Sequence, residues 1–462
     1  MTLAKSIATV CLAAGLCSCA TMEPHYTRPA DAVPSAFPVA ITNATAGAGV
    51  NWADVGYQDF FADTRLRQVI ATALENNRDL RIAIANIQAA RAQYRVQRSE
   101  LVPTVGGNAS ADISGGTGND STSPNRYQLS VGVSSYELDL WGRIRSLSKS
   151  ALEQYLATEE AALSTRIVLV SAVATAWLQL AADRTGLKVA QDTLRSSQES
   201  VVVAKRRLDA GVASGLDLQQ ATTIVAQAEA AIAQQKTAVA QDKNALDLLV
   251  GAPVPETLLA PIVDDKVALL NQLPANLASD ALLKRPDVLA AEHRLRSSNF
   301  DIGAARAAFF PTISLTGSVG TASTSLSGLF SGLGWSFGPG VTLPFLDGGR
   351  NRANLDFARA QNVAQVATYE RTVQIAFREV ADGLARRGTI DDEVAANAKL
   401  VAAAAASLKL SRLRYDVGID TYLNVLEAQR TLFSAQQSLV TARLARAANT
   451  VTLYQVLGGG VR

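Results

Sequence analysis

The residues that most often do chemistry in proteins are scarce in this chain, and they do not cluster. Its 462 residues include two histidines, His25 and His293, and three cysteines. No serine, cysteine or metal-ligand pattern surrounds either histidine, so there is little material for a catalytic or zinc centre. The run Asp347–Arg350 lacks the lysine and the spacing of a phosphate-binding loop, and a turn from a strand into a helix explains it better. We expect no catalytic, metal or cofactor-binding residues, and an exported enzyme is the weakest interpretation.

Cys19 is the residue for which the sequence predicts a covalent modification. A short positive region precedes the apolar stretch Ile7–Leu16, which is typical of a secretory signal and too short to span a bilayer. The segment that follows resembles a bacterial lipobox, in which a leucine stands three residues before a lipidated cysteine. This predicts a signal peptide at 1–18, a lipid on Cys19 and, because Ala20 and not aspartate follows, the outer membrane. The alternative is an ordinary cleaved signal that leaves Cys19 as an incidental thiol.

Charge and hydropathy exclude other classes of protein. Lys and Arg number 43 against 41 Asp and Glu, so the formal net charge is +2. Near-neutrality excludes a strongly basic nucleic-acid binder, and we expect no nucleic-acid partner. The longest apolar helical run, Ile167–Ala182, is too short and too polar for a membrane helix.

An internal duplication is visible at an offset of 207 or 208 residues, which predicts two units with one plan. Each unit contains a long tract without proline and then apolar residues seven apart, a pattern that indicates a coiled-coil helical hairpin. The hairpins are predicted to turn at Gly211 and Gly418, although such stripes also line ordinary helical bundles. The matching pairs are Asn77–Leu80 with Arg285–Val288, Leu101–Val105 with Phe309–Ile313, Gly142-Arg143 with Gly349-Arg350, and Asp209–Gly211 with Asp416–Gly418.

Four segments between the helices alternate apolar and small polar residues. Their length suits tilted membrane strands with an apolar face toward lipid, although a soluble half-buried sheet gives the same alternation. Four strands leave two open edges, which hydrocarbon does not tolerate, so the chain must associate. Two copies give eight strands and a filled interior, whereas three give twelve and a lumen, which favours a trimer. The predicted strands lie in 104–114, 127–134, 312–319 and 335–345, with loops at 115–126 and 320–334.

The predicted domains follow from these elements. They are 1–18, the signal peptide; 19–65, a lipidated N-terminal extension; 66–276, the first repeat, with a β-hairpin at 103–139 and a helical hairpin at 143–250; and 277–462, the second repeat and C-terminus, with hairpins at 311–345 and 350–456.

Seven motifs occur in order and cover nearly the whole mature chain. Through these motifs the chain resembles the TolC-like outer membrane factors, particularly the lipoprotein branch typified by OprM and NodT. The resemblance implies a mixed α and β membrane protein. It would be a trimeric channel-tunnel with a twelve-stranded transmembrane β-barrel, four strands per chain, and a long periplasmic α-helical coiled-coil barrel. The motifs are Tyr136–Arg143, Arg285–Val288, Ile302–Arg306, Phe309–Gly317, Asp347–Arg350, Glu427–Arg430 and Leu457–Gly460.

The same resemblance implies a function and partners. The chain would be the passive outer-membrane channel of a tripartite efflux pump, extending into the periplasm and docked with an adaptor (membrane fusion) protein and an inner-membrane pump of the RND type. The exported substrate stays open among drugs, dyes, metals and aromatic compounds. One alternative is a channel for type I protein secretion, against which the lipobox and the OprM-like motifs argue. Another is a non-conducting, lipid-anchored coiled coil, which the alternating strands oppose.

The family's gate lies at the periplasmic hairpin tips, and the resemblance carries it onto residues of this chain. Alignment on Gly418 places Asn424 and Glu427 where the family has two constricting acidic residues, and Leu423 where the OprM branch has a hydrophobic ring. Asn424 departs from the acidic pattern, and Asp420 is a candidate to compensate for it. The alternative for Glu427 is a plain solvated helix residue.

Tyr415 and Asp217 match positions that link the two hairpins in the closed state of TolC-like proteins. A hydrogen bond from the phenol to the carboxylate would be a latch that docking could break. The alternative is that Tyr415 continues the heptad seam and Asp217 caps the following helix.

Overall fold

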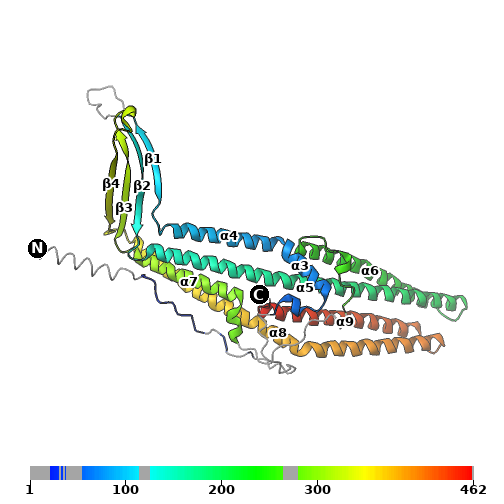
Figure 1. Cartoon of the computed structure of the whole chain (residues 1–462). Helices are drawn as coiled ribbons and strands as arrows, with labels where there is room; N and C mark the ends of the chain where they lie inside the picture. The colour runs from blue at the N-terminus through cyan, green and yellow to red at the C-terminus, as the bar shows by residue number, and fades with distance from the viewer. Residues whose placement is uncertain are drawn as a thin grey trace. The chain divides into compact units, whose positions relative to one another are not determined.

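A computed structural model describes residues 21–30, 33–34, 37, 55–113, 125–263 and 279–459 (Figure 1). The expected signal peptide and Cys19 lie outside the described residues. The chain divides into two compact units. Unit 1 comprises Met1–Ala30, Asn86–Glu159 and Ala290–Arg371, and unit 2 comprises Asp31–Ala85, Glu160–Leu289 and Thr372–Arg462.

Unit 1 contains one antiparallel sheet in the order β1-β2-β3-β4 (Figure 1). Its strands are β1 (Val105–Asp112), β2 (Arg126–Leu138), β3 (Thr312–Ser323) and β4 (Gly334–Thr342). The four strands expected from alternation are therefore confirmed. The loop expected at 320–334 begins too early, because β3 pairs with β2 as far as Ser323 and a 3-10 turn, η4 (Leu326–Gly328), follows.

Pairing between β2 and β3 joins the two sequence repeats in one sheet. Val131 lies opposite Val319, which lies opposite Trp335, so apolar residues share one face. On the other face Ser318 and Ser336 approach with their hydroxyl oxygens 2.9 Å apart. Gly132 is required where β2 and β3 approach each other closely, because a Cβ there would lie 2.7 Å from the Cα of Ser318. The alternation thus produces the two distinct faces that the sequence predicts.

The two 67-residue helices each begin a few residues after an aspartate that follows a strand. Asp139 accepts hydrogen bonds from the backbone N–H groups of Ile144 and Arg145 at the start of α5 (Arg143–Asp209). Asp347 does the same for Gly349 and Asn351 at the start of α8 (Arg350–Asp416). These bonds satisfy N–H groups that a helix start leaves without partners. The run Asp347–Arg350 is therefore a strand-to-helix turn, as predicted, and not a phosphate loop.

The N-terminal segment 21–30 packs on α7 (Pro286–Ala307) within unit 1. Arg28 and Arg296 both bind the buried Glu292, at 2.5 and 2.6 Å, and Glu23 binds Lys149 at 2.8 Å. Burial alone would raise the pKa of Glu292, but the two guanidinium groups outweigh it and lower the pKa. Charged side chains therefore attach this segment to the helices.

Unit 2 contains helices of both repeats. Besides parts of α5 and α8 it holds α6 (Gly215–Val250) and α9 (Tyr422–Val456), and the shorter α2 (Tyr57–Phe60) and α3 (Thr64–Asn76); α4 (Arg78–Ser99) contributes residues to both units. The two long helical hairpins, α5–α6 and α8–α9, are confirmed. An 18-residue stretch of α5 has a mean hydropathy of 1.6, apolar enough for a membrane span, but half of it is buried inside the protein. Trp177 of α5 is fully buried and donates to the Leu258 carbonyl at 2.9 Å, which favours a core helix.

The duplication is visible in matching contacts of unit 2. The Asn77 side chain donates to the carbonyl of Leu249 near the end of α6, and the Arg285 side chain donates to the carbonyl of Val456 at the end of α9, each at 2.8 Å. Gly251, which follows α6, has a positive φ that permits the left-handed helix end. Both repeats thus attach the end of their hairpin in the same way.

Candidate functional site

The candidate site comprises the two hairpin tips in unit 2. We call 207–217, between α5 and α6, the first tip, and 414–427, between α8 and α9, the second tip. Gly211 and Gly418 have φ of 72° and 79°, in the left-handed region that favours glycine. The N–H of Val212 donates to the Arg207 carbonyl, and that of Ile419 donates to the Arg414 carbonyl, both at 2.9 Å. These bonds are typical of a glycine-terminated helix, and both predicted turns are confirmed.

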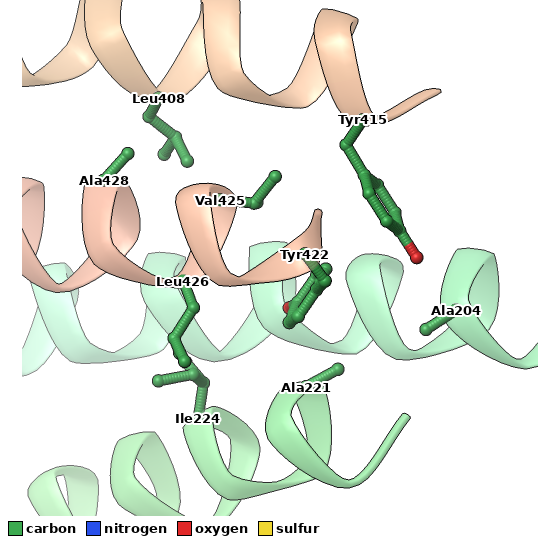
Figure 2. Close-up of a cluster of buried hydrophobic side chains, with 9 residues drawn as sticks. All are labelled: Ala204, Ala221, Ile224, Leu408, Tyr415, Tyr422, Val425, Leu426 and Ala428. Carbon is green, nitrogen blue, oxygen red and sulfur yellow. The ribbon is translucent and has the colours of Figure 1, made fainter. Parts of the chain in front are cut away.

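Two tyrosines form the core of the second tip. Tyr415 is 5% exposed and Tyr422 is 1% exposed, and their rings meet edge to face with centroids 5.3 Å apart. Figure 2 shows them extending from α8 and α9 into a buried cluster, in which Leu426 of α9 and Ile224 of α6 point toward one another. The second tip is therefore packed against both helices of the first hairpin.

Arg207 of α5 joins the first tip to the second. Its guanidinium lies 4.6 Å from the centre of the Tyr415 ring, and its Nη1 donates to the carbonyls of Tyr415 and Asp416 at 2.7 and 3.0 Å. These carbonyls end α8, where the helix dipole favours a cation. We did not predict a role for Arg207 from the sequence. The available signal was its basic character in the last turn of α5 and its match to Arg414 in the repeat.

Further polar contacts tie α5 to the second hairpin. Arg412 of α8 donates to the Ser196 hydroxyl, and the buried Gln429 of α9 donates to the Ser197 hydroxyl at 2.7 Å. A cavity of about 140 Å³ lies beside these contacts and is bordered by Tyr415, Tyr422 and Arg412. The seam between the hairpins near the tips is thus partly polar and not completely filled.

The expected latch residues lie at the two tips but do not bond to each other in this structure. The Tyr415 hydroxyl has no hydrogen-bond partner among the described residues. Asp217 instead forms a capping box with Ser214 at the start of α6, with N–H to oxygen distances of 3.2 and 3.4 Å. Burial raises the pKa of Tyr415, and the negative charge of Asp217 raises it further while Arg207 opposes the change. Asp217 therefore acts on the phenol through its charge.

The expected gate residues lie on the exposed side of α9. Leu423 is 48% exposed, and Asn424 and Glu427 are also exposed. Arg430 lies one turn after Glu427, with its Nη1 3.8 Å from the carboxylate. The structure brings these side chains to one helix face, while the opposite face packs on the first hairpin.

Asp420 is not a free negative charge. Its carboxylate accepts from Arg414 Nε at 2.5 Å, and that bond, with a further one from Asn424, holds the pKa of Asp420 below its usual value. The compensating role expected for Asp420 stays a prediction, and in this structure Arg414 balances its charge.

The two histidines of the chain belong to unit 1, whereas the tips belong to unit 2. His293 of α7 contacts Glu153 of α5 in unit 1, with its Nδ1 2.6 Å from the carboxylate. His25 lies in the N-terminal segment. In the part of the chain that the structure describes, no group of three or more His, Cys, Asp or Glu residues is arranged to hold a metal ion.

The structure combines long helical hairpins, whose tips contact each other, with a sheet that has two edges unpaired among the described strands and one apolar face. This combination is the one expected for the class of outer-membrane channel proteins. The profile of the outer membrane efflux protein family matches residues 69–252 and 277–459. The chain belongs to the outer membrane efflux protein family, and it acts in efflux across the outer membrane and extends into the periplasm.

Named relatives and solved structures agree with this assignment. The chain is 46% identical over 413 residues to the solvent efflux pump outer membrane protein SrpC of Pseudomonas putida, covering 87% of each chain. It is 42% identical over 460 residues to the outer membrane protein OprJ of Pseudomonas aeruginosa, covering 98% of this chain and 94% of that one. The open-state MtrE outer membrane channel of Neisseria gonorrhoeae has 38% identity and a TM-score of 0.87, covering 96% of this chain and 99% of that one.

Proposed function

We propose that the chain is the passive exit duct of a tripartite efflux pump and acts as a homotrimer. The observation that carries this proposal is the pair of open edges in the sheet, since among the described strands β1 pairs only with β2 and β4 only with β3. Hydrocarbon does not tolerate such edges. Two further copies would supply the strands needed for a twelve-stranded barrel with a lumen. The partners would be a periplasmic adaptor and an inner-membrane pump of the RND type.

The proposed cargo is small organic molecules. Relatives are named for the efflux of solvents, toluene and antibiotics, which supports small-molecule export over type I protein secretion. The two-faced strands argue against a non-conducting coiled coil, because a purely structural rod needs no alternating sheet. In such a duct the chain would do no catalysis, and its energy would come from the inner-membrane partner.

A lipid on Cys19 would anchor each copy. Support comes from Thr21, which packs against Gly142 at the start of α5, where a Cβ would lie 2.9 Å from the threonine methyl group. Cys19 precedes Thr21 by two residues in the sequence. Gly142 adjoins Trp141, whose ring stacks on Phe310 at 4.6 Å and whose Nε1 donates to the Pro311 carbonyl next to β3. A lipid there would enter the membrane beside the proposed barrel. Mass spectrometry of the mature N-terminus tests this.

The gate in this proposal is the exposed side of α9 at the second tip. Three copies of Leu423 would close the aperture by excluding water, and three copies of Glu427 would attract cations to it. Asn424 and Asp420 would border the same opening, with Asp420 balanced by Arg414. The exposure of Leu423 and Glu427 on a helix whose other face is packed supports this assignment.

Planar-bilayer conductance of the detergent-extracted protein tests the duct and its gate. We expect a small conductance for the wild type and a sharp rise for Leu423→Ser combined with Glu427→Gln, because the apolar ring and the narrow carboxylate ring are both lost. Leu216→Ser, at the matching position of the first tip, is the control and should leave conductance unchanged. Absence of conductance in every variant, with a folded trimer, would favour the non-conducting coiled coil.

The latch would form when Tyr415 turns its hydroxyl to Asp217. Support comes from the buried, unpartnered Tyr415 hydroxyl and from the long 3.4 Å bond by which Asp217 caps α6, which is easily exchanged. Tyr415→Phe combined with Asp217→Ala should raise the resting conductance. Ser214→Ala weakens the same cap but leaves both latch residues in place, so it should not raise the resting conductance. An unchanged double mutant with an intact trimer would leave Tyr415 as a seam residue and Asp217 as a cap.

A further inference from the structure

A second cavity, away from the tips, lies against α5, α6 and α9 in unit 2. Its volume is about 450 Å³, within the roughly 300–1,000 Å³ that is usual for small-molecule sites. Alanine and valine side chains, among them Val168 and Ala172, form an apolar wall. The polar lining comprises Ser171, Thr175 and Gln179 of α5, Asp242 of α6 and Gln455 of α9.

One polar group in this lining is buried without a partner. Ser171 is only 3% exposed, and its hydroxyl has no hydrogen-bond partner among the described residues. Burying a hydroxyl without a hydrogen bond is unfavourable, so an unpartnered one beside a cavity points to a missing ligand atom. The Oδ2 atom of Asp242 likewise has no donor among the described residues.

Asp242 has a second carboxyl group, that of Asp183, beside it. Burial, a hydrogen bond that protonated Asp242 donates to Asp183 of α5, and the negative charge of Asp183 together raise the pKa of Asp242 to about 7. Gln179 donates to Asp183 at 3.2 Å and orients it. A neighbouring negative charge disfavours ionisation of Asp242, so its neutral and ionised forms coexist near neutral pH. A bound cation would stabilise the fully ionised pair.

We propose that this cavity binds a small organic ammonium ion, whose charged nitrogen pairs with Asp242 and donates to Ser171, and whose apolar part lies against Val168 and Ala172. On binding, the proton on Asp242 leaves to solvent. A single metal ion fits less well, because the cavity is far larger than an ion and much of its wall is apolar. The site is separate from the proposed gate and does not depend on it.

Other charged groups nearby are already occupied. Lys243 follows Asp242 on α6 and binds Asp247 at 2.6 and 2.8 Å. Arg184 follows Asp183 on α5 and binds Glu256 and the Ala260 carbonyl. The residue that α9 contributes to the lining, Gln455, is uncharged. Asp242 is therefore the lining residue that carries a charge, and its pKa is raised to about 7.

Isothermal titration of the full-length, detergent-extracted protein tests the proposal with 2-phenylethylamine and its neutral counterpart 2-phenylethanol. The amine should bind and the alcohol should not, since only the amine is charged. Because an alkylammonium keeps its proton well above neutral pH, affinity should follow the ionisation of Asp242 and be roughly tenfold tighter at pH 8 than at pH 6. Equal binding of the alcohol, pH-independent binding or no binding by the wild type at pH 8 would overturn the proposal.

Two variants localise the effect. Asp242→Asn should weaken amine binding at pH 8 at least tenfold. Asp183→Asn frees Asp242 to ionise at lower pH, so binding should persist at pH 6 and its pH dependence should shift downward. Glu229→Gln, an exposed acid on the same helix, is the matched control and should bind as the wild type does. Circular dichroism confirms folding, and unchanged binding by a folded Asp242→Asn would also overturn the proposal. The wild-type comparisons of pH and of amine with alcohol do not depend on any variant.

Discussion

The two hairpin tips derive from one duplicated sequence and share one backbone turn, yet their side chains are arranged differently. At the first tip the Ser214–Asp217 capping box stabilises the start of α6. At the second tip Thr421 makes no side-chain cap, and an ion pair and two buried tyrosines take its place. A glycine turn can therefore be retained while the interactions around it diverge.

The matching arginines show the same divergence. Arg414 binds Asp420 within its own turn, whereas Arg207 reaches across and binds the end of α8. The second tip is thus held both by an ion pair of its own and by Arg207 of the first tip. This dependence on the first tip suits a second tip that changes position, as the proposed gate requires.

The largest expected difference between the tips comes from removing Tyr422. Tyr422→Ala leaves a cavity among Tyr415, Val425 and Leu426 and should lower the local free energy of opening by about 3 kcal/mol, which makes amide exchange about a hundredfold faster. Hydrogen–deuterium exchange of the second tip measures this. The control is Leu216→Ala near the start of α6 at the first tip, where the side chain is 64% exposed and little change is expected. Equal protection in both variants would mean that the tyrosine cluster does not hold the tip.

A smaller difference is expected between the two arginines. Arg207→Ala removes the cation from the Tyr415 ring and from the end of α8, and should cost about 1–2 kcal/mol at the second tip. Arg207→Lys keeps the charge but loses the stacked, planar contact, so the stability of its second tip should lie between those of the wild type and Arg207→Ala. Arg414→Ala breaks an exposed ion pair and should change exchange little. If Arg414→Ala proved the more damaging variant, the second tip would be self-contained after all.

The smallest expected difference concerns the helix caps. Ser214→Ala should cost the first tip about 1 kcal/mol, because the serine oxygen accepts from the N–H of Asp217. Thr421→Ala should have almost no effect, since the threonine side chain makes no cap bond. Exchange rates of the first-turn amides of α6 and α9 give the comparison directly. If Thr421→Ala lowered amide protection at the start of α9 as much as Ser214→Ala lowers it at the start of α6, or more, the two tips would use the same cap.

Local patterns explain why much of the fold was predictable. Gly211 and Gly418 mark the turns because the left-handed backbone there favours glycine. Strand alternation revealed the two faces of the sheet for a similarly local reason. Asp347 was correctly interpreted as part of a strand-to-helix turn. The end of β3 was misplaced, because its last residues through Ser323 are held by pairing with β2, which lies almost 200 positions earlier.

The candidate site was predicted only in part. The resemblance directed attention to the exposed residues Leu423 and Glu427, and the heptad pattern placed Tyr415 in the seam. The role of Arg207 and the balancing of Asp420 by Arg414 depend on rotamers and neighbours that no motif specifies. The unpartnered Tyr415 hydroxyl could likewise be found only from coordinates.

The sequence by itself determined the duplicated plan, the helical hairpins and their glycine turns, and the alternating strands, because each depends on spacing and backbone preference within a short stretch. The tertiary structure alone decided which strands pair across the repeats, that Arg207 holds the end of α8, and that Asp183 and Asp242 meet beside a cavity. Those contacts join residues that are distant in the chain, and their energies depend on burial and neighbouring charge, which exist only once the helices have packed.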